Sequence, residues 1–230
     1  WEVALCIVVA ASRRLRKFLH AQEAGRLTAC FNAGLSACEK TSQWEQAEAL
    51  LSGMNISTVH HDILSLNAII SACDKAGEWQ RALSWLSIAR CEHPVTTATL
   101  NASLSACSRA HQWGYALALL REFRNADEGP ACDLWSYTAV VSAGERSGVW
   151  QLSLLLLAEM WTDRLAPNLI SYRCAARACA RNQRWQAAVA VFQVMRERSI
   201  VDKEASVWSA AVWACEAAGA RRPQPPGWAL

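Results

Sequence analysis

The stretch LNAIISACDKAGEW, residues 66–79, is one of five similar stretches in this chain. The other four are FNAGLSACEKTSQW (31–44), LNASLSACSRAHQW (100–113), YTAVVSAGERSGVW (137–150) and YRCAARACARNQRW (172–185). Each closes on a tryptophan, and successive tryptophans lie 35, 34, 37 and 35 residues apart. A period of this length is typical of repeat proteins, in which each repeat buries its apolar face against its neighbours.

Each copy predicts a pair of helices. Apolar residues recur at offsets 0, 3, 4 and 7 from Leu66, which is one stripe of a helix. A polar break at Gly77 ends the stripe, since glycine readily takes the left-handed conformation that closes a helix. A second stripe starts at Trp79, and its regular apolar offsets favour a core role for the tryptophan over a base-stacking role. We therefore expect an all-α, right-handed α-solenoid of helix-turn-helix repeats of about 35 residues.

The period also predicts how the chain is divided. Five full repeats are expected at 28–62, 63–96, 97–133, 134–168 and 169–203. Residues 1–27 are expected to hold a truncated repeat helix and an irregular insertion, 204–218 a partial sixth repeat, and 219–230 a Pro-rich disordered tail. The apolar run at 3–11 is too short to span a bilayer, and basic residues follow it rather than precede it, unlike a signal peptide. We expect a monomer with no membrane contact.

Cysteine and histidine usage argues against an enzyme. Five of the ten cysteines share one slot on the apolar stripe of the first helix, where small buried hydrophobes are expected: Cys38, Cys73, Cys107, Cys179 and Cys215. No two cysteines have the C-x-x-C spacing, and no histidine is followed two residues later by glutamate. The five histidines lie in predicted loops or turns, and none recurs with the repeat. We expect no catalytic residue, no metal and no cofactor.

A basic residue stands two places after the cysteine slot in every repeat. The five are Lys40, Lys75, Arg109, Arg146 and Arg181. Equivalent positions of a solenoid line up along one face, so these cations are predicted to follow a phosphate backbone. A plainer interpretation is a solvated helix end, where cations interact favourably with the helix dipole. The two interpretations are compatible.

A polar residue also recurs at the fifth position of each repeat. These residues are Asn32, Asn67, Asn101, Thr138 and Arg173. Asparagine is a poor helix former, and nothing in the apolar pattern requires it there. The positions are either ligand-binding or simply polar residues at a helix entry, and the pattern alone leaves both open.

These features together resemble the pentatricopeptide repeat family, with repeats like its P type. The resemblance covers most of residues 28–217 and rests on the period, the YNxxISAC-like first helix, the second-helix pattern at 188–195, and the closing Pro-Asn or Pro-x-x-Asp. A tryptophan that opens the second helix departs from the aliphatic residue usual in the family. The resemblance implies an α-solenoid that binds single-stranded RNA, one base per repeat, read by two or three side chains.

The resemblance also implies roles for single residues. It pairs the fifth residue of a repeat with the last one: Asn32 with Asp62, Asn67 with Thr96, Asn101 with Asp133, and Thr138 with Asn168. In the family, Asn with Asp is similar to a uracil reader, and Thr with Asn to an adenine reader. Val95 is an alternative to Thr96, and Arg173 with Lys203 or Glu204 fits no familiar pair. The second residue of each repeat would sandwich the base, which points to Leu64, Trp135 and Ile170, with small Ala29 and Ala98 in the same position.

The function implied is sequence-selective RNA binding without catalysis, in organellar RNA processing, stability or translation. The family implies mitochondria or chloroplasts, although no transit peptide is visible in this chain. An RNA-processing enzyme would be a further partner. Two alternatives stay open: a scaffold that holds a protein segment in its concave groove, and the RNA-binding fragment of a larger RNA-processing enzyme. A scaffold would need neither the cation row nor the Asn–Asp pairs.

Overall fold

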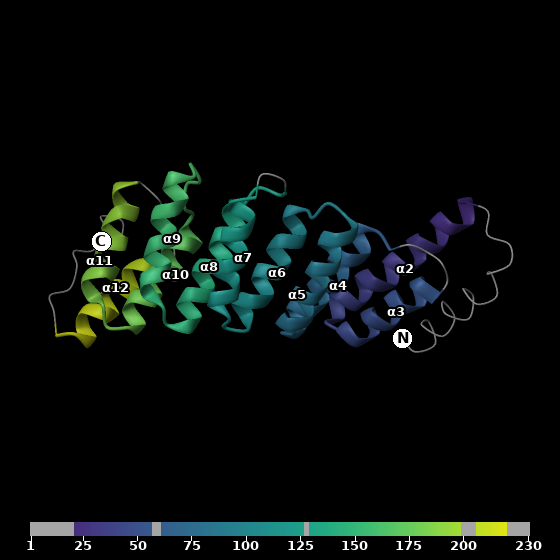
Figure 1. Ribbon diagram of the computed structural model, residues 1–230. Helices are drawn as coiled ribbons and strands as arrows, with labels where there is room; N and C mark the ends of the chain where they lie inside the picture. The colour runs from purple at the N-terminus through teal and green to yellow at the C-terminus, as the bar shows by residue number, and fades with distance from the viewer. Residues whose placement is uncertain (1–20, 57–60, 127–128, 199–205, 220–230) are drawn as a thin grey trace. The chain divides into compact units, whose positions relative to one another are not determined.

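The computed structural model describes residues 21–56, 61–126, 129–198 and 206–219, and in these ranges it contains helices and no strand (Figure 1). The helices are α2 (Ala21–Thr41), α3 (Trp44–Ile56), α4 (Ile63–Ala76), α5 (Trp79–Glu92), α6 (Thr97–Arg109), α7 (Trp113–Arg124), α8 (Leu134–Ser147), α9 (Trp150–Thr162), α10 (Leu169–Arg181), α11 (Trp185–Glu197) and α12 (Ser206–Ala217). The predicted all-α repeat solenoid is confirmed.

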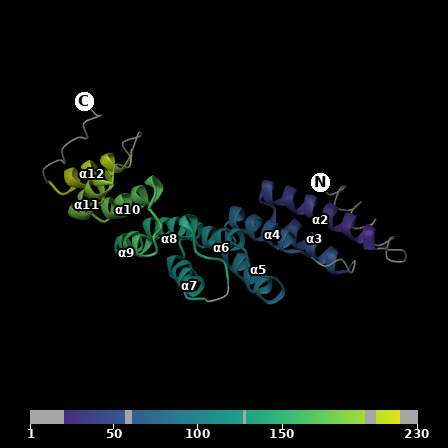
Figure 2. The ribbon, with the colours of Figure 1, turned by 90° about the horizontal axis from the view of Figure 1, so that it is seen from above.

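The helices group into two compact units, each built of stacked hairpins. Unit 1 comprises Trp1–Ala110 and Asp127–Pro130, and unit 2 comprises His111–Ala126 and Ala131–Leu230. In unit 1, α4 packs between α2 and α6, with α3 and α5 on the other side of this layer (Figure 2). In unit 2, α10 packs between α8 and α12 in the same way, with α7, α9 and α11 behind. First helices of successive repeats therefore form one layer of each unit, and second helices form the other.

The first helices begin at a capping residue. Asp62, Thr96, Asp133 and Asn168 precede α4, α6, α8 and α10, and each side chain accepts a hydrogen bond from the backbone N–H three residues later. Such a bond satisfies an N–H group that the helix itself leaves unpaired. Helix α2 differs, because it continues back to Ala21 through a segment expected to be irregular. Residues 1–20 and 220–230, which hold the expected truncated helix and Pro-rich tail, lie outside the described residues.

Every first helix with a following turn ends in the left-handed conformation. One residue per repeat has positive φ: Ser42 (58°), Gly77 (83°), His111 (59°), Gly148 (74°) and Gln183 (57°). After four of these helices, the next N–H donates to the carbonyl of the cysteine slot, as in Glu78 to Cys73 at 2.9 Å. Two of these residues are glycines, at 77 and 148; the other three copies hold the same conformation with a side chain, which costs about 1 kcal/mol each.

The cysteine slot lies in the core, whereas the recurring tryptophans lie at its edge. Cys38, Cys73, Cys107, Cys179 and Cys215 are fully buried. Trp150 and Trp185 are only partly buried and pack against the cluster that contains Cys179, and Trp113 is 38% exposed. The tryptophan side chains thus pack on the surface of the core and are not fully enclosed by it. None of the helices in the described part of the chain combines the length and apolar character needed to cross a membrane.

Candidate nucleic-acid interface

The first predicted reading pair makes direct contact. Asn32 Nδ2 on α2 donates to both carboxylate oxygens of Asp62, at 3.3 and 3.2 Å, across the junction of two repeats. Ser65 Oγ donates to Asn32 Oδ1 at 2.6 Å and lies 2.8 Å from Asp62 Oδ1. Burial alone would raise the pKa of Asp62, but hydrogen bonds from the Ser65 backbone and hydroxyl and from Asn32 lower it below its usual value. Asp62 is therefore held as a carboxylate beside the amide of Asn32.

The second predicted pair, Asn67 and Thr96, is joined through an intermediate hydroxyl. Thr99 Oγ1 donates to Asn67 Oδ1 at 2.5 Å and lies 2.9 Å from Thr96 Oγ1. Thr96 rather than Val95 is the capping residue of α6, so it takes the place that Asp62 holds in the preceding junction. The fifth-position amide thus reaches the capping residue through one hydroxyl.

The pair in unit 2 follows the same plan. Thr138 Oγ1 lies 3.0 Å from Ser171 Oγ, and Ser171 Oγ donates to Asn168 Oδ1 at 3.0 Å. Thr138 Oγ1 also donates to the Leu134 carbonyl at 2.7 Å, and its side chain is buried. Fifth position, third helical residue and capping residue therefore form one hydrogen-bonded group in each of these junctions.

The intermediate hydroxyls were missed by sequence reasoning. They belong to Ser65, Thr99 and Ser171, and Ser136 stands at the same position of α8. A signal was present, because a capping residue followed three places later by Ser or Thr is a variant of the capping box. The same signal shows that the last residue of each repeat has a structural duty as helix cap, besides any contact with a ligand.

The remaining predicted pairs involve residues of both units or residues outside the described ranges. Asn101 belongs to unit 1 and Asp133 to unit 2, and each is described within its own unit. The Asp133 side chain accepts from Ser136 N at 2.8 Å as the cap of α8. The two expected partners of Arg173, Lys203 and Glu204, lie outside the described residues.

Four of the five predicted base-sandwich positions are exposed to solvent. Leu64 is 63% exposed and Trp135 is 62% exposed, although both are large and apolar. Ala29 and Ala98 are exposed as well, and Ile170 is half-buried. The exposed side chains lie outside the core, where they are accessible to a ligand.

A groove in unit 1 joins the reading and sandwich positions. It has a volume of about 380 Å³ and is lined on α2, α4 and α6 by Asn32, Leu64, Asn67 and Ala98, together with small residues. Glu39 also borders it. The groove thus presents amides, hydroxyls and one exposed aliphatic side chain.

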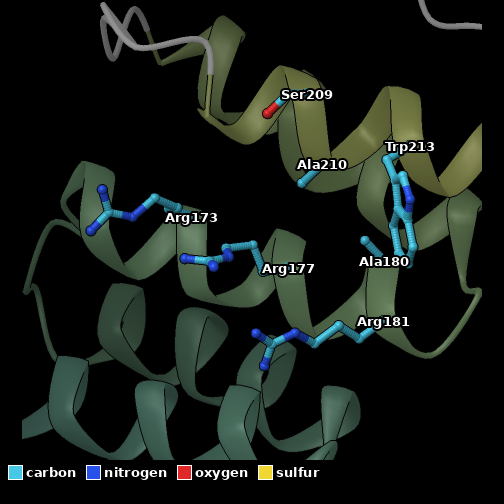
Figure 3. A pocket seen from close by; sticks show the side chains of 7 residues that line it. All are labelled: Arg173, Arg177, Ala180, Arg181, Ser209, Ala210 and Trp213. Atoms are coloured by element: carbon cyan, nitrogen blue, oxygen red, sulfur yellow. The ribbon is translucent and has the colours of Figure 1, made fainter.

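A second groove lies in unit 2 between α10 and α12, with a volume of about 480 Å³. Figure 3 shows three arginines, at 173, 177 and 181, that extend from α10, with Trp213 of α12 beside Ala180. Arg173 is the fifth residue of its repeat, and Arg181 is the last member of the predicted cation row. This groove therefore gathers guanidinium groups where unit 1 has amides.

The five predicted backbone cations are exposed and lie in the last turn of their helices. This is the place where a cation meets the negative end of the helix dipole. Three of them also pair with an acid of the preceding repeat, which the sequence analysis did not anticipate. Lys75 Nζ lies 3.0 Å from Glu39 Oε1, Arg109 Nε lies 3.1 Å from Asp74 Oδ1, and Arg181 Nη1 lies 3.7 Å from Glu145 Oε1. The row is thus less positive than its cations alone imply.

The described residues also contain one group of possible metal ligands, where the sequence predicted none. His61, Glu92 and His93 of unit 1 offer ligand atoms that all lie within 4.8 Å of one another. Two imidazoles and a carboxylate suit zinc. Here His61 Nε2 lies 2.5 Å from Glu92 Oε2, and His93 Nε2 lies 3.1 Å from the His61 carbonyl oxygen. These contacts already explain the cluster as a link between the residues that precede α4 and the end of α5.

The buried thiols are poorly suited to nucleophilic chemistry. Burial raises the pKa of Cys73 to about 12, and those of Cys107 and Cys179 to about 11. The thiolate is the reactive form of cysteine, and these thiols stay protonated near neutral pH. They act as core residues.

Comparison with known proteins gives a family match and a fold. A model of the PPR repeat matches residues 170–200. A comparison with curated proteins finds no match. The maize pentatricopeptide repeat protein PPR10 is similar in structure, with a TM-score of 0.65 and 20% identity over 93% of this chain and 31% of its own. This chain thus spans about a third of PPR10.

A second similar structure is the PPR domain of Arabidopsis thaliana protein-only RNase P 1, solved in complex with tRNA. It has a TM-score of 0.67 and 14% identity over 81% of this chain and 97% of that domain. Likenesses at these identities show the fold. The family-model match identifies residues 170–200 as a PPR repeat, and the sequence motif of that stretch recurs in the other repeats of the chain.

Proposed function

We propose that this chain binds single-stranded RNA, with one base facing each repeat. The observation that carries the proposal is the contact between Asn32 and Asp62, two side chains 30 residues apart that meet beside the groove of unit 1. An amide and a carboxylate together offer donors and acceptors to the Watson–Crick edge of a base. Exposed Leu64 lies in the same groove, where it would cover the face of that base.

RNA as the ligand class is supported by the similar proteins. PPR10 has been solved in complex with an 18-nt psaJ RNA element, and this chain matches that structure with a TM-score of 0.65 and 19% identity. The PPR domain of protein-only RNase P 1 has been solved with tRNA. With the code implied by the family, the preferred site runs 5′-U-pyrimidine-U-A-any-3′.

The backbone contacts belong to the exposed cations. Lys40, Lys75, Arg109, Arg146 and Arg181 would meet phosphates, and a phosphate would replace the acid that pairs with three of them. Five phosphate contacts on a single strand would make log K fall against log salt with a slope of about −3.5. Because Glu39, Asp74 and Glu145 already neutralise part of the row, we expect a shallower slope.

The biological role we propose is non-catalytic. The chain would act as a monomer in mitochondria or chloroplasts, occupy a site on a transcript and recruit an RNA-processing enzyme. A second candidate is the RNA-binding part of a larger RNA-processing enzyme, which the likeness to nearly the whole PPR domain of protein-only RNase P 1 favours. Under either candidate, the described helices contribute RNA binding.

The test is base preference at the Asn32–Asp62 pair. First, an RNA selection with the purified chain identifies a preferred sequence, and four RNAs then vary the base that faces the first repeat. Asn32→Thr should move the preference from uracil toward guanine, as the family's code implies, with affinity for the matched RNA within about tenfold of wild type. Asn55→Thr, the same change at an exposed site on α3, is the matched control. Identical rankings of the four bases by wild type and N32T would refute the assignment, and a selection that enriches no RNA would favour a protein scaffold.

A further inference from the structure

We propose that the groove between α10 and α12 is a nucleotide clamp that accepts any base: Trp213 stacks on the base while Arg177 and Arg181 hold its phosphate. The proposal rests on the RNA binding proposed above. It also explains why Arg173 fits no reading pair, since this repeat would not discriminate among bases.

The three arginines share one face of α10. Residues 173, 177 and 181 are spaced by four, so their side chains lie above one another on the helix surface. At the same repeat positions, α4 of unit 1 carries Asn67, Ser71 and Lys75. A guanidinium has five donors and no acceptor, so it cannot pair with the exocyclic amine of adenine or cytosine, but it suits the oxygens of a phosphate. The groove is therefore built for an anion rather than for a chosen base edge.

Trp213 provides the second half of the clamp. Its side chain is 53% exposed and lines the groove beside Ala180 (Figure 3). It stands two places before the cysteine slot, where Ser36 and Ser71 stand in unit 1. An indole face stacks on every base, so the contact tolerates any sequence. Nothing in the described core requires an aromatic side chain at this exposed place.

A buried carboxylate holds two of the arginines in place. Arg177 Nε lies 3.4 Å and Arg181 Nη1 lies 3.7 Å from Glu145 Oε1, whose side chain is 9% exposed. The two arginine side chains are 49% and 52% exposed. One carboxylate shared by two guanidiniums leaves excess positive charge and orients both groups while other N–H donors face solvent. The volume of about 480 Å³ is within the range of roughly 300–1,000 Å³ of small-ligand sites.

The experiment measures binding of the full chain to four RNAs that differ only at the base facing repeat five, within the sequence selected above. Wild type should bind all four alike, and Trp213→Ala should weaken all four about tenfold, because one stacked base is lost. Trp213→Phe should keep most of the affinity. Trp161→Ala on α9, another exposed tryptophan, is the matched control and should leave binding unchanged.

Arg177→Ala tests the phosphate contact, with Arg121→Ala on α7 as the charge-matched control. Loss of one phosphate contact should reduce the steepness of the salt slope by about 0.7 in R177A, whereas R121A should keep the wild-type slope. Arg181 still faces Glu145 in R177A, so the carboxylate keeps a partner, and the helical signal in circular dichroism checks folding.

Two results overturn the clamp while leaving RNA binding intact. One is a folded W213A variant that binds the four RNAs as tightly as wild type. The other is a wild-type preference for guanine that Arg173→Ala removes, because arginine can also read the O6 and N7 acceptors of guanine. A wild-type chain that binds no RNA at all rejects the proposed function itself, and the clamp with it.

Discussion

The grooves of the two units occupy the same places in the repeat but differ in chemistry. In unit 1, α2, α4 and α6 present asparagines, serines and one exposed leucine. In unit 2, α10 and α12 present three arginines and an exposed tryptophan. The apolar stripes and the capped helix starts are the same in both, so the scaffold sets where a side chain stands and leaves its chemistry open. Different repeats can therefore present different side chains, amides and hydroxyls in one groove and guanidiniums with an indole in the other.

The largest effect we expect concerns how the core of each unit is packed. Helices α4 and α5 of unit 1 have Cys73 and Ala82 at equivalent repeat positions, whereas α8 and α9 of unit 2 have Gly144 and Ser153 there. A Cβ at Gly144 would lie 2.9 Å from Ser153 Oγ, closer than two such atoms can approach. Gly144→Cys should therefore destabilise the chain by about 2 kcal/mol through overpacking.

The double variant sharpens this point. Gly144→Cys with Ser153→Ala reproduces the unit 1 pair and should recover most of the lost stability, since the clashing oxygen is gone. Ser153→Ala alone is the control, and it removes only a long hydrogen bond to the Val141 carbonyl at 3.4 Å. Thermal melting of the four proteins measures the coupling, and strictly additive effects would show that the two positions are not compensating partners.

An effect of intermediate size is expected from two substitutions of Asp62 in unit 1, which distinguish its role as a helix cap from its proposed role in base reading. Asp62→Ala removes the cap of α4 and should cost about 1 kcal/mol, whereas Asp62→Asn keeps a good capping residue and should cost much less. Both should change the base preference of the first repeat. Denaturation and binding to the four RNAs of that repeat are measured in parallel. If D62N keeps both stability and the wild-type base ranking, Asp62 is a cap and nothing more.

Low pH should reduce the stability of the folded chain by protonating the carboxylate of Asp62. The pKa of Asp62 is lower in the folded chain than its ordinary value of 3.8. Its contribution to stability is therefore fully present above pH 3.8 and is lost as the pH falls through the lower, folded value. Asp62→Asn should flatten this part of the stability profile below about pH 4.

The smallest effect concerns the acids beside the cations. In unit 1 Lys75 pairs with Glu39 at 3.0 Å, whereas in unit 2 two arginines share one buried carboxylate. Exposed pairs are worth under about 1 kcal/mol, so Glu39→Gln should free Lys75 and strengthen RNA binding about twofold at low salt. The gain should vanish at high salt, and Glu45→Gln, an exposed acid in the first turn of α3, should show none. Equal gains in both variants would mean that overall charge, rather than the Lys75 pair, sets the affinity.

The fold was predictable because the same apolar pattern occurs in five copies of the repeat. Apolar offsets in one copy are ambiguous, but the same offsets around Leu66, Leu100 and Tyr137 leave little choice of element. The burial of the cysteine slot followed from the same stripe. The tryptophans were harder, because periodicity shows that Trp113 belongs to the apolar face but not how far it projects from the packed helices.

The repeat period gave the candidate site residues their equivalent positions, but it did not give the contacts that these residues make. Contacts between repeats join residues more than 30 places apart, and no local pattern shows that Glu39 reaches Lys75 or that Ser65 reaches Asn32. The sequence shows an acidic residue directly before the basic residue in three repeats, at 39–40, 74–75 and 145–146. Their partners became visible only when neighbouring helices were placed side by side. The approach of His61 to Glu92 has the same origin.

The capping role of the last residue in four repeats would restrict how the proposed base preference could change. Asp62, Thr96, Asp133 and Asn168 all start the next helix with their side chains. Only a few short polar residues can do so, chiefly Asp, Asn, Ser and Thr. A change of base preference that stays within this set keeps the helix start, whereas any change outside it also loosens the junction between two repeats. Under the proposed base reading, folding would therefore limit this position to the few residue types that also cap a helix.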